Sequence, residues 1–86
     1  MKKLSFVDES WEDYNYWFIT NKKIFKKLNL IIKEIKRTPF EGIGKPEALK
    51  YKYQGCWSQR LDKEHRIVYK VNDDEVIIIS CRFHYD

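Results

Sequence analysis

The sequence predicts an α+β fold in which two N-terminal helices pack on one face of a mainly antiparallel β-sheet. Three observations predict it: a short β-prone run at residues 4–7, apolar residues at helical spacing within residues 22–37, and strand-like segments between about residues 50 and 85. With 86 residues, 43% of them hydrophobic and 35% charged, the chain has the composition of a folded globule. We expect one domain over residues 1–86, because a single core needs most of that length.

The first two predicted elements are a strand over residues 3–7 and a helix over about residues 10–20. Ser10 and Asp13 have the spacing of a capping box, in which the Ser10 hydroxyl accepts the Asp13 amide proton. The aromatic side chains of this helix form one broad face, which we expect to pack into the core: Trp11, Tyr14, Tyr16, Trp17 and Phe18.

The second predicted helix, over residues 22–37, has the clearest pattern in the chain. Its apolar residues recur at helical spacing, and Pro39 ends the helix after Arg37. The opposite face carries seven basic residues against Glu34 alone: Lys22, Lys23, Lys26, Lys27, Lys33, Lys36 and Arg37. Such a face is either a solvated surface or a contact surface for phosphate groups, and both interpretations stand at this point.

A loop over residues 38–46 contains the prolines and two of the glycines, but it lacks the Gly-Lys-Ser/Thr ending of a phosphate-binding loop. After it, residues 47–50 are predicted to form one helical turn. The predicted strands of the sheet then follow at residues 51–53, 57–61, 66–71 and 75–83. The last of these is apolar on both faces at residues 76–79, which is typical of an interior strand.

Several classes of protein are excluded by composition. No run of about 18 apolar residues occurs, which excludes a transmembrane helix. The apolar stretch near the N-terminus ends at Asp8 and is too short for a signal peptide, so we expect a cytoplasmic protein. Cys56 and Cys81 are expected to be small, half-buried hydrophobic residues. Together with His65 and His84 they lack the close spacing of a zinc site, so we expect no metal and no cofactor.

The arginines are distributed unevenly along the chain. Arg60, Arg66 and Arg82 fall in the predicted sheet, whereas the lysines crowd the helices. A guanidinium grips a phosphate through two parallel N–H groups, while a lysine acts as a point charge. In a chain of net charge +4, this division predicts an anion-binding site on the sheet.

A carboxylate, an imidazole and a guanidinium at that site would suit metal-free cleavage of RNA, whose own 2′-hydroxyl is the nucleophile. Glu47 could take the 2′-hydroxyl proton, His84 could protonate the leaving 5′-oxygen, and Arg66 could hold the developing charge. Arg66 and His84 share a face only if the last hairpin has an odd-length loop or a bulge, or if His84 leaves the strand. Each residue also has an ordinary interpretation, as a helix-start glutamate, a surface arginine and a frayed His84–Tyr85 end.

Several motifs in collinear order resemble the Txe/YoeB family of toxins, within the RelE superfamily. They lie at residues 10–14 (SWEDY), 37–42 (RTPFEG), 44–47 (GKPE), 57–58 (WS), 64–69 (EHRIVY) and 81–85 (CRFHY). The resemblance covers nearly the whole chain.

The resemblance implies a RelE-like α+β fold and a type II toxin that cleaves mRNA held in the A site of the 70S ribosome, without a metal. It also implies a YefM-like antitoxin and a homodimer. Through the matching motifs it implies Glu47 as general base, Arg66 as the group that stabilises the transition state, and His84 as general acid followed by Tyr85. The expected substrate-binding residues are Lys50, Arg60 and Arg82.

The sequence departs from the family pattern at three positions. Gln59 stands where relatives carry a further arginine, so one phosphate contact is expected to be lost. Cys56 replaces a bulkier apolar residue. Asp86 extends past Tyr85 and, being acidic, is expected to favour the protonated imidazole of His84.

Two classes of function fit these residues, and a third fits less well. The first is a ribosome-dependent endoribonuclease. The second is a non-catalytic protein that binds the ribosome or RNA and blocks translation by occupying its binding site. Both predict a salt-dependent affinity for RNA. The third is a degenerate toxin that is kept only as a binding partner of the antitoxin. This third function is disfavoured because the sequence retains Glu47, Arg66 and His84.

Overall fold

The computed structural model describes residues 2–42 and 44–83, so the expectations for His84, Tyr85 and Asp86 concern residues outside the described part of the chain. The elements in chain order are β1 (Lys3–Phe6), α1 (Asp8–Thr20), α2 (Lys22–Arg37), β2 (Glu47–Ala48), the 3₁₀ turn η1 (Tyr51–Tyr53), β3 (Cys56–Arg60), β4 (Arg66–Val71) and β5 (Glu75–Ser80).

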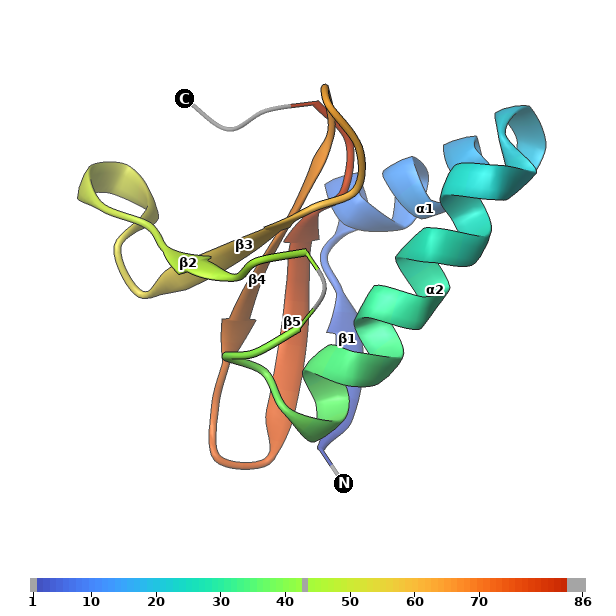
Figure 1. Cartoon of the computed structure of the whole chain (residues 1–86). Coiled ribbons are helices and arrows are strands. Elements are labelled where there is room, and N and C mark those ends of the chain that lie inside the picture. The colour runs from blue at the N-terminus through green and yellow to red at the C-terminus, as the bar shows by residue number, and fades with distance from the viewer. Residues whose placement is uncertain (1, 43, 84–86) are drawn as a thin grey trace.

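The strands form one five-stranded sheet in the order β1-β5-β4-β3-β2. β1 pairs with β5 in parallel, and the other neighbours pair antiparallel. Both helices lie on the same side of the sheet, and the β2–β3 part with η1 extends away from them (Figure 1). The predicted α+β class is therefore confirmed.

The core lies between the helices and the sheet. α2 covers the range predicted for it, and its apolar stripe is buried. Gln59 and Leu61 alternate with Ser58 and Arg60 along β3 and its end, so the two faces of the sheet carry different residue types. The core cluster consists of Trp17, Leu28, Ile31, Ile32, Ile35, Leu61, Ile67, Tyr69, Val76, Ile78 and Cys81.

α1 begins two residues earlier than predicted, and the predicted capping box is wrong. Val7 is the N-cap residue and provides no side-chain cap. The fully buried Ser10 hydroxyl instead lies 2.9 Å from the Val7 carbonyl oxygen and 2.6 Å from that of Ile78 on β5. Ser10 therefore joins the first turn of the helix to the sheet.

The expectation that the whole aromatic face of α1 is core is also wrong. Trp17 is buried at 4% exposure, but Trp11 and Phe18 are 52% and 57% exposed. Trp11 stacks on Tyr14, with ring centroids 5.7 Å apart. The aromatic face of this helix therefore lies partly in the core, at Trp17, and partly on the surface of the protein, at Trp11 and Phe18.

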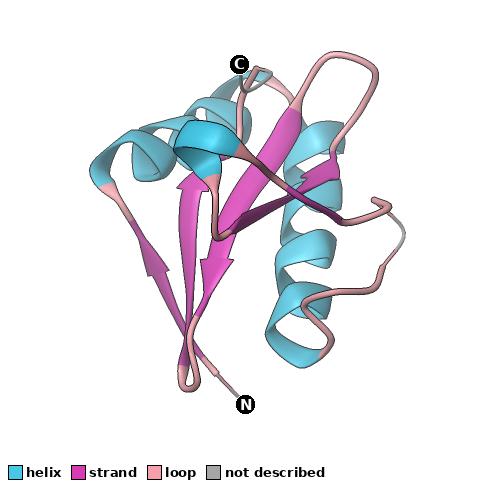
Figure 2. Cartoon of the chain, turned by 90° about the vertical axis from the view of Figure 1, so that its left-hand side faces the viewer, coloured by secondary structure: helices cyan, strands magenta, loops and turns pink. Residues whose placement is uncertain are grey.

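The local structure around residues 47–53 is the reverse of the prediction. Glu47 and Ala48 form a strand opposite Ser58 and Trp57, instead of a helical turn. The next three residues form the 3₁₀ turn η1 instead of a strand, beginning at Tyr51 with φ of 58° (Figure 2). A left-handed residue cannot continue a strand, which is why the alternating Tyr-Lys-Tyr pattern misleads.

β5 lies between β1 and β4, so the predicted interior position is confirmed, although the strand ends at Ser80 instead of residue 83. The register shifts by one residue, since Tyr69 pairs with Ile78 whereas Val68 pairs with Ser80. A bulge in the last hairpin is one of the three alternatives that the sequence argument named; His84, whose side it was to set, lies outside the described residues.

Candidate active site

An ion pair joins Glu47 on β2 to Arg66 on β4, across the intervening strand β3. Nη2 of Arg66 lies 3.1 Å from Oε1 of Glu47. The Arg66 side chain is 12% exposed and the Glu47 side chain 55%. The sheet therefore brings together the two residues that the sequence assigns as base and charge stabiliser, with the arginine largely buried and the carboxylate open to solvent.

Ser58 orients this arginine. Its hydroxyl accepts a hydrogen bond of 3.0 Å from Nε of Arg66, and Ser58 is fully buried. Ser58 is also the residue directly opposite Glu47 in the β2–β3 register. The sequence argument assigned no role to Ser58; its position two residues before Arg60 on one strand face is the signal that could have found it.

Arg60 lies directly opposite Arg66 in the β3–β4 register, so both side chains are on the same face of the sheet. Like charges at directly opposite positions are unfavourable unless something compensates them. Glu47 compensates one of the two arginines. A bound anion would compensate the other, which is consistent with the predicted phosphate site.

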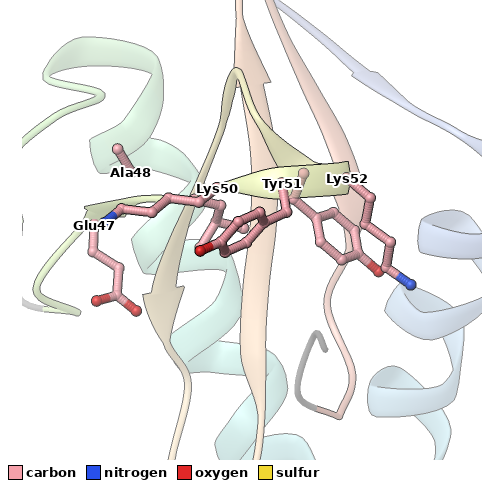
Figure 3. A pocket seen from close by; sticks show the side chains of 7 residues that line it. Glu47, Ala48, Lys50, Tyr51 and Lys52 are labelled. Atoms are coloured by element: carbon pink, nitrogen blue, oxygen red, sulfur yellow. The ribbon is translucent and has the colours of Figure 1, made fainter.

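Lys50 shares a surface hollow with Glu47. The hollow has a volume of about 540 Å³ and is lined by residues 47–53. Glu47, Lys50 and Tyr51 are among its lining side chains in Figure 3. Tyr51 is 91% exposed, so the hollow offers an open aromatic ring as well as a lysine. This combination of cation and open ring is the one that single-stranded nucleic acids recognise.

Arg82 is placed differently from the other predicted substrate-binding residues. Its guanidinium carbon lies 3.6 Å from the centroid of the Tyr16 ring on α1 and 4.4 Å from that of Phe83. The structure therefore brings together Glu47, Lys50, Arg60 and Arg66, and holds Arg82 between two aromatic rings.

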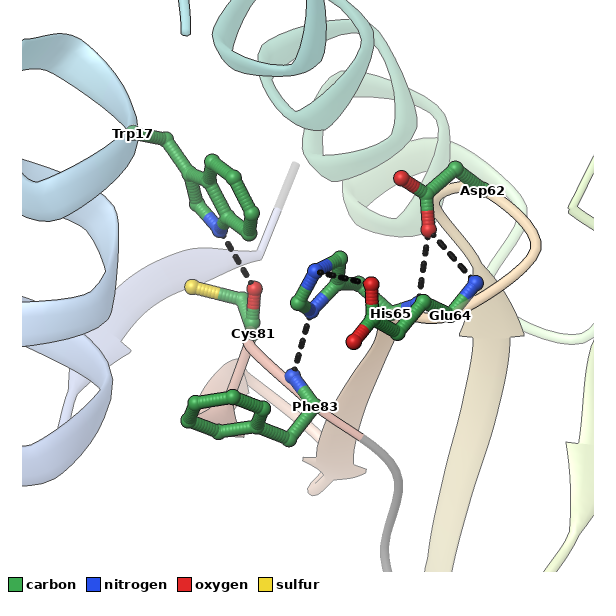
Figure 4. Close-up of polar contacts among 6 residues, drawn as sticks. All are labelled: Trp17, Asp62, Glu64, His65, Cys81 and Phe83. Carbon is green, nitrogen blue, oxygen red and sulfur yellow. Dashed lines mark hydrogen bonds and ion pairs between the residues drawn. The ribbon is translucent and has the colours of Figure 1, made fainter. Parts of the chain in front are cut away.

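The segment after β5 is fixed to α1 and to the start of β4 (Figure 4). The Cys81 amide donates to Oδ2 of Asp13 at 3.1 Å, and Nε1 of Trp17 donates to the Cys81 carbonyl at 2.7 Å. The Phe83 amide donates to Nδ1 of His65 at 2.7 Å. Burial raises the pKa of Asp13, although the bond from Cys81 acts in the opposite direction.

Gln59, where a phosphate contact was expected to be lost, lies on the core face of β3 and not on the face of Arg60 and Arg66. Gln59 is fully buried, and its Nε2 donates to the Tyr69 hydroxyl at 3.2 Å. That hydroxyl in turn donates to the Pro39 carbonyl at 2.6 Å. Burial raises the pKa of Tyr69. Gln59 is therefore a core residue that holds the loop after α2.

The cysteines have the environments expected for small hydrophobic residues. Cys56 is partly buried and Cys81 is fully buried, and burial raises the pKa of the Cys81 thiol. Over residues 2–42 and 44–83, no group of three or more His, Cys, Asp or Glu side chains is arranged to hold a metal ion. Within the same ranges, neither helix has the length and apolarity needed to cross a bilayer.

Comparisons with known proteins point to one family. Residues 6–85 match the family described as YoeB-like toxin of bacterial type II toxin–antitoxin system. A relative named toxin YoeB from Escherichia coli O6:H1 is 57% identical over 83 residues, which cover 96% of this chain and 99% of the relative.

Solved structures agree with this match. The chain resembles one in a YoeB–YefM complex from Staphylococcus aureus, with a TM-score of 0.89 and 44% identity over 99% of both chains. It also resembles a chain of the YoeB dimer from Staphylococcus aureus, with a TM-score of 0.90 and 44% identity over 98% of both chains.

Proposed function

Because the chain belongs to the YoeB-like toxins of bacterial type II toxin–antitoxin systems, we propose that it is a ribosome-dependent endoribonuclease. It cuts mRNA at the ribosomal A site in the cytoplasm and thereby inhibits translation. The reaction uses the 2′-hydroxyl of the RNA as nucleophile and side chains of this chain as acid, base and charge stabiliser.

In the proposed reaction, Glu47 takes the proton of the 2′-hydroxyl, and the 2′-oxygen attacks the adjacent phosphorus. Arg66 and Arg60 stabilise the negative charge that develops on the phosphorane oxygens. The bond to the 5′-oxygen breaks, and His84 supplies the proton to that leaving oxygen, with Tyr85 beside it. The products are a 2′,3′-cyclic phosphate and a 5′-hydroxyl. Lys50 binds the neighbouring phosphate.

One observation carries the proposal: the solvent-exposed Glu47 carboxylate is 3.1 Å from a largely buried arginine, which a second arginine faces across the strand. A structural ion pair would need no second cation at that place. A phosphodiester supplies the negative charge that balances Arg60 once Glu47 balances Arg66.

The partners are part of the proposal. The solved relatives named above include a YoeB–YefM complex and a YoeB dimer, which supports a YefM-like antitoxin and a homodimer for this chain. A net charge of +4 favours the binding of an acidic antitoxin segment that covers the sheet face carrying Arg60 and Arg66. Such a complex is expected to weaken as salt concentration rises.

The deciding experiment is primer extension on a defined message, with and without translating ribosomes, comparing the wild type with Glu47→Gln. We expect discrete cuts at the A-site codon that require ribosomes and fall by about 10²–10⁴-fold in the variant. Glu41→Gln, a substitution of an exposed glutamate in the loop after α2, is the matched control and should cut like the wild type.

The other outcomes separate the competing functions. Cuts on free RNA would support a nuclease activity but would contradict its dependence on the ribosome. A block of translation without new RNA ends, equally strong in Glu47→Gln, would favour inhibition by occupancy and contradict the enzyme.

A further inference from the structure

We propose that His65 is a positioning residue for the reaction, because it fixes the backbone of Phe83 and with it the direction in which the chain continues to His84. The proposal rests on the proposed function, in which His84 is the general acid. His65 itself need not touch the RNA.

Both polar backbone groups of Phe83 are bound by two consecutive residues. The Phe83 amide donates to Nδ1 of His65 at 2.7 Å, and the Arg66 amide donates to the Phe83 carbonyl at 3.1 Å. Phe83 has a φ of 66°, in the left-handed region that residues other than glycine seldom adopt. The two bonds, of which Figure 4 shows the one to His65, hold the backbone in this conformation at the last described residue before His84.

The imidazole can accept this bond in only one form. Nδ1 accepts a hydrogen bond only when it carries no proton, so His65 is neutral with its proton on Nε2. Nε2 lies 3.6 Å from Oε1 of Glu64, which favours a proton on that nitrogen. The bond from the Phe83 amide, and not this longer contact, therefore defines the tautomer.

The ring of His65 is itself held in place. His65 is 9% exposed, and its ring packs in a T-shaped arrangement with Trp17, with centroids 4.7 Å apart. Its backbone amide donates to Oδ1 of Asp62 at 2.7 Å. A side chain fixed by core packing and by its own backbone can fix another segment in turn.

Two more features connect the bonded backbone of Phe83 to the proposed reaction. Arg66 contributes its amide to Phe83 and its side chain to Glu47, so one residue links the base to the segment that leads to the acid. The guanidinium of Arg82 lies over the rings of Tyr16 and Phe83 and holds the same segment against α1. We therefore include Arg82 as an anchor of this segment.

The test compares His65→Leu, which has no acceptor, with His65→Asn, whose Oδ1 is as many bonds from Cβ as Nδ1 is. The first readout is amide hydrogen exchange. We expect the Phe83 amide to exchange at least about tenfold faster in His65→Leu, and close to the wild-type rate in His65→Asn. The Cys81 amide, bound to Asp13, is an internal control and should change little.

The second readout is single-turnover cleavage on programmed ribosomes. A misplacement of about 1 Å can cost about a hundredfold in rate. We therefore expect the maximal single-turnover rate constant of His65→Leu to fall by about ten- to a hundredfold, while the ribosome concentration that gives half of this rate stays nearly unchanged. His65→Asn should recover most of the rate. Lys63→Gln, at an exposed position of the same turn, is the matched control and should cleave within about twofold of the wild type.

The outcomes are distinguishable. Equal losses in His65→Leu and His65→Asn, or no loss in either, would overturn the proposal. A proton on Nδ1 in the ¹⁵N spectrum of the wild-type imidazole would overturn it without any variant, even if His65→Leu failed to fold. If the wild type does not cleave RNA at all, the proposed function fails, while hydrogen exchange still decides whether His65 holds Phe83.

Discussion

Nη2 of Arg66 lies 3.1 Å from Oε1 of Glu47, although 19 positions separate the two residues in sequence. The contact exists because β2 and β4 pair with the two edges of β3, so that one face of the sheet gathers both side chains. The arginine is thus fixed before any substrate is present. A phosphate that enters the site competes with Glu47 for the same guanidinium, which would release the carboxylate for proton transfer.

Arg66→Lys should reduce the single-turnover cleavage rate by about 10²–10³-fold. Lysine keeps the charge but lacks the planar fork, whose Nε binds Ser58 while its Nη2 binds Glu47 and would be available to a phosphate that displaces it. Arg37→Lys makes the same chemical change at the exposed end of α2 and should leave the rate unchanged. A variant at position 66 that keeps more than about a tenth of the rate would contradict this role.

Ser58→Ala should lower kcat by about tenfold and the free energy of unfolding by about 1 kcal/mol, because Nε of Arg66 loses its buried acceptor. Steady-state cleavage and urea unfolding measure the two effects. Ser80→Ala on β5 is the control on the same sheet. An unchanged kcat with reduced stability would mean that Ser58 serves the fold alone.

Gly44→Ala should destabilise the fold by about 1–3 kcal/mol. An added Cβ would lie 2.7 Å from Cβ of Gln59 and 3.0 Å from the carbonyl oxygen of Arg60. Gly44 also accepts a hydrogen bond from the Arg60 amide through its own carbonyl at 2.9 Å, so the strain falls on β3.

For a domain of this size, thermal unfolding should show a decrease in Tm of at least about 4 °C. Gly55→Ala is the useful comparison, since nothing lies within 4 Å of its Cβ position and only its φ of 94° opposes the change. A smaller decrease for Gly44→Ala than for Gly55→Ala would contradict the crowding around Gln59.

Asp62 should contribute a pH-dependent share of stability. Burial acts to raise the pKa of Asp62, but the amides of His65 and Glu64, which donate to Oδ1 at 2.7 and 2.8 Å, together with nearby positive charge that includes Lys27, hold the pKa below its ordinary value. The stabilisation is therefore complete above the unfolded pKa of about 3.9 and is lost as pH falls through the folded pKa.

Urea unfolding of the wild type and Asp62→Asn tests this. The wild type should be more stable at pH 6, and the difference should shrink at pH values below about 4. Asp73→Asn, in the exposed turn between β4 and β5, should show little difference at either pH. A difference that persists at low pH would assign the stabilisation to packing.

The basic face of α2 is testable through salt dependence. Lys26 and Lys33 border a hollow of about 440 Å³ with Leu30, and both are exposed. If this face contacts phosphates, replacing both lysines with Gln should make the slope of log K against log salt less steep by about 0.7–0.9 per lysine in ribosome binding. Lys3→Gln on β1 is the control. An unchanged slope would mean that the face is solvated.

The sequence argument succeeded where the signal is local. α2 has the range predicted from its apolar spacing, because one sequential stripe meets the core. Arg60 and Arg66 lie on one face because the short antiparallel strands predicted for them keep their residues in register, and Glu47 joins them from a strand where a helical turn was predicted. It failed where a distant partner decides the structure. Ser10 is held by Ile78 on β5, and no property of residues 8–13 reveals that partner.

The missed positioning residue has the same explanation. The partner of His65 is the backbone amide of Phe83, which has no side-chain signature in the sequence. Phe83 itself was predicted inside a strand, but the strand ends at Ser80 and the backbone turns into the left-handed region. A side-chain pattern cannot predict a contact made by the main chain.

The parallel pairing of β1 with β5 has a consequence for synthesis. β1 is made first, yet the strand that pairs with it, β5, comprises residues 75–80. A growing chain therefore carries β1 and β4 with open edges until those residues have left the ribosome, and the core that supports the face of Glu47 and Arg66 is completed last, when Val76, Ile78 and Cys81 join it. We expect a nascent toxin to stay harmless to the ribosome that makes it, because the order of translation delays assembly of its active face.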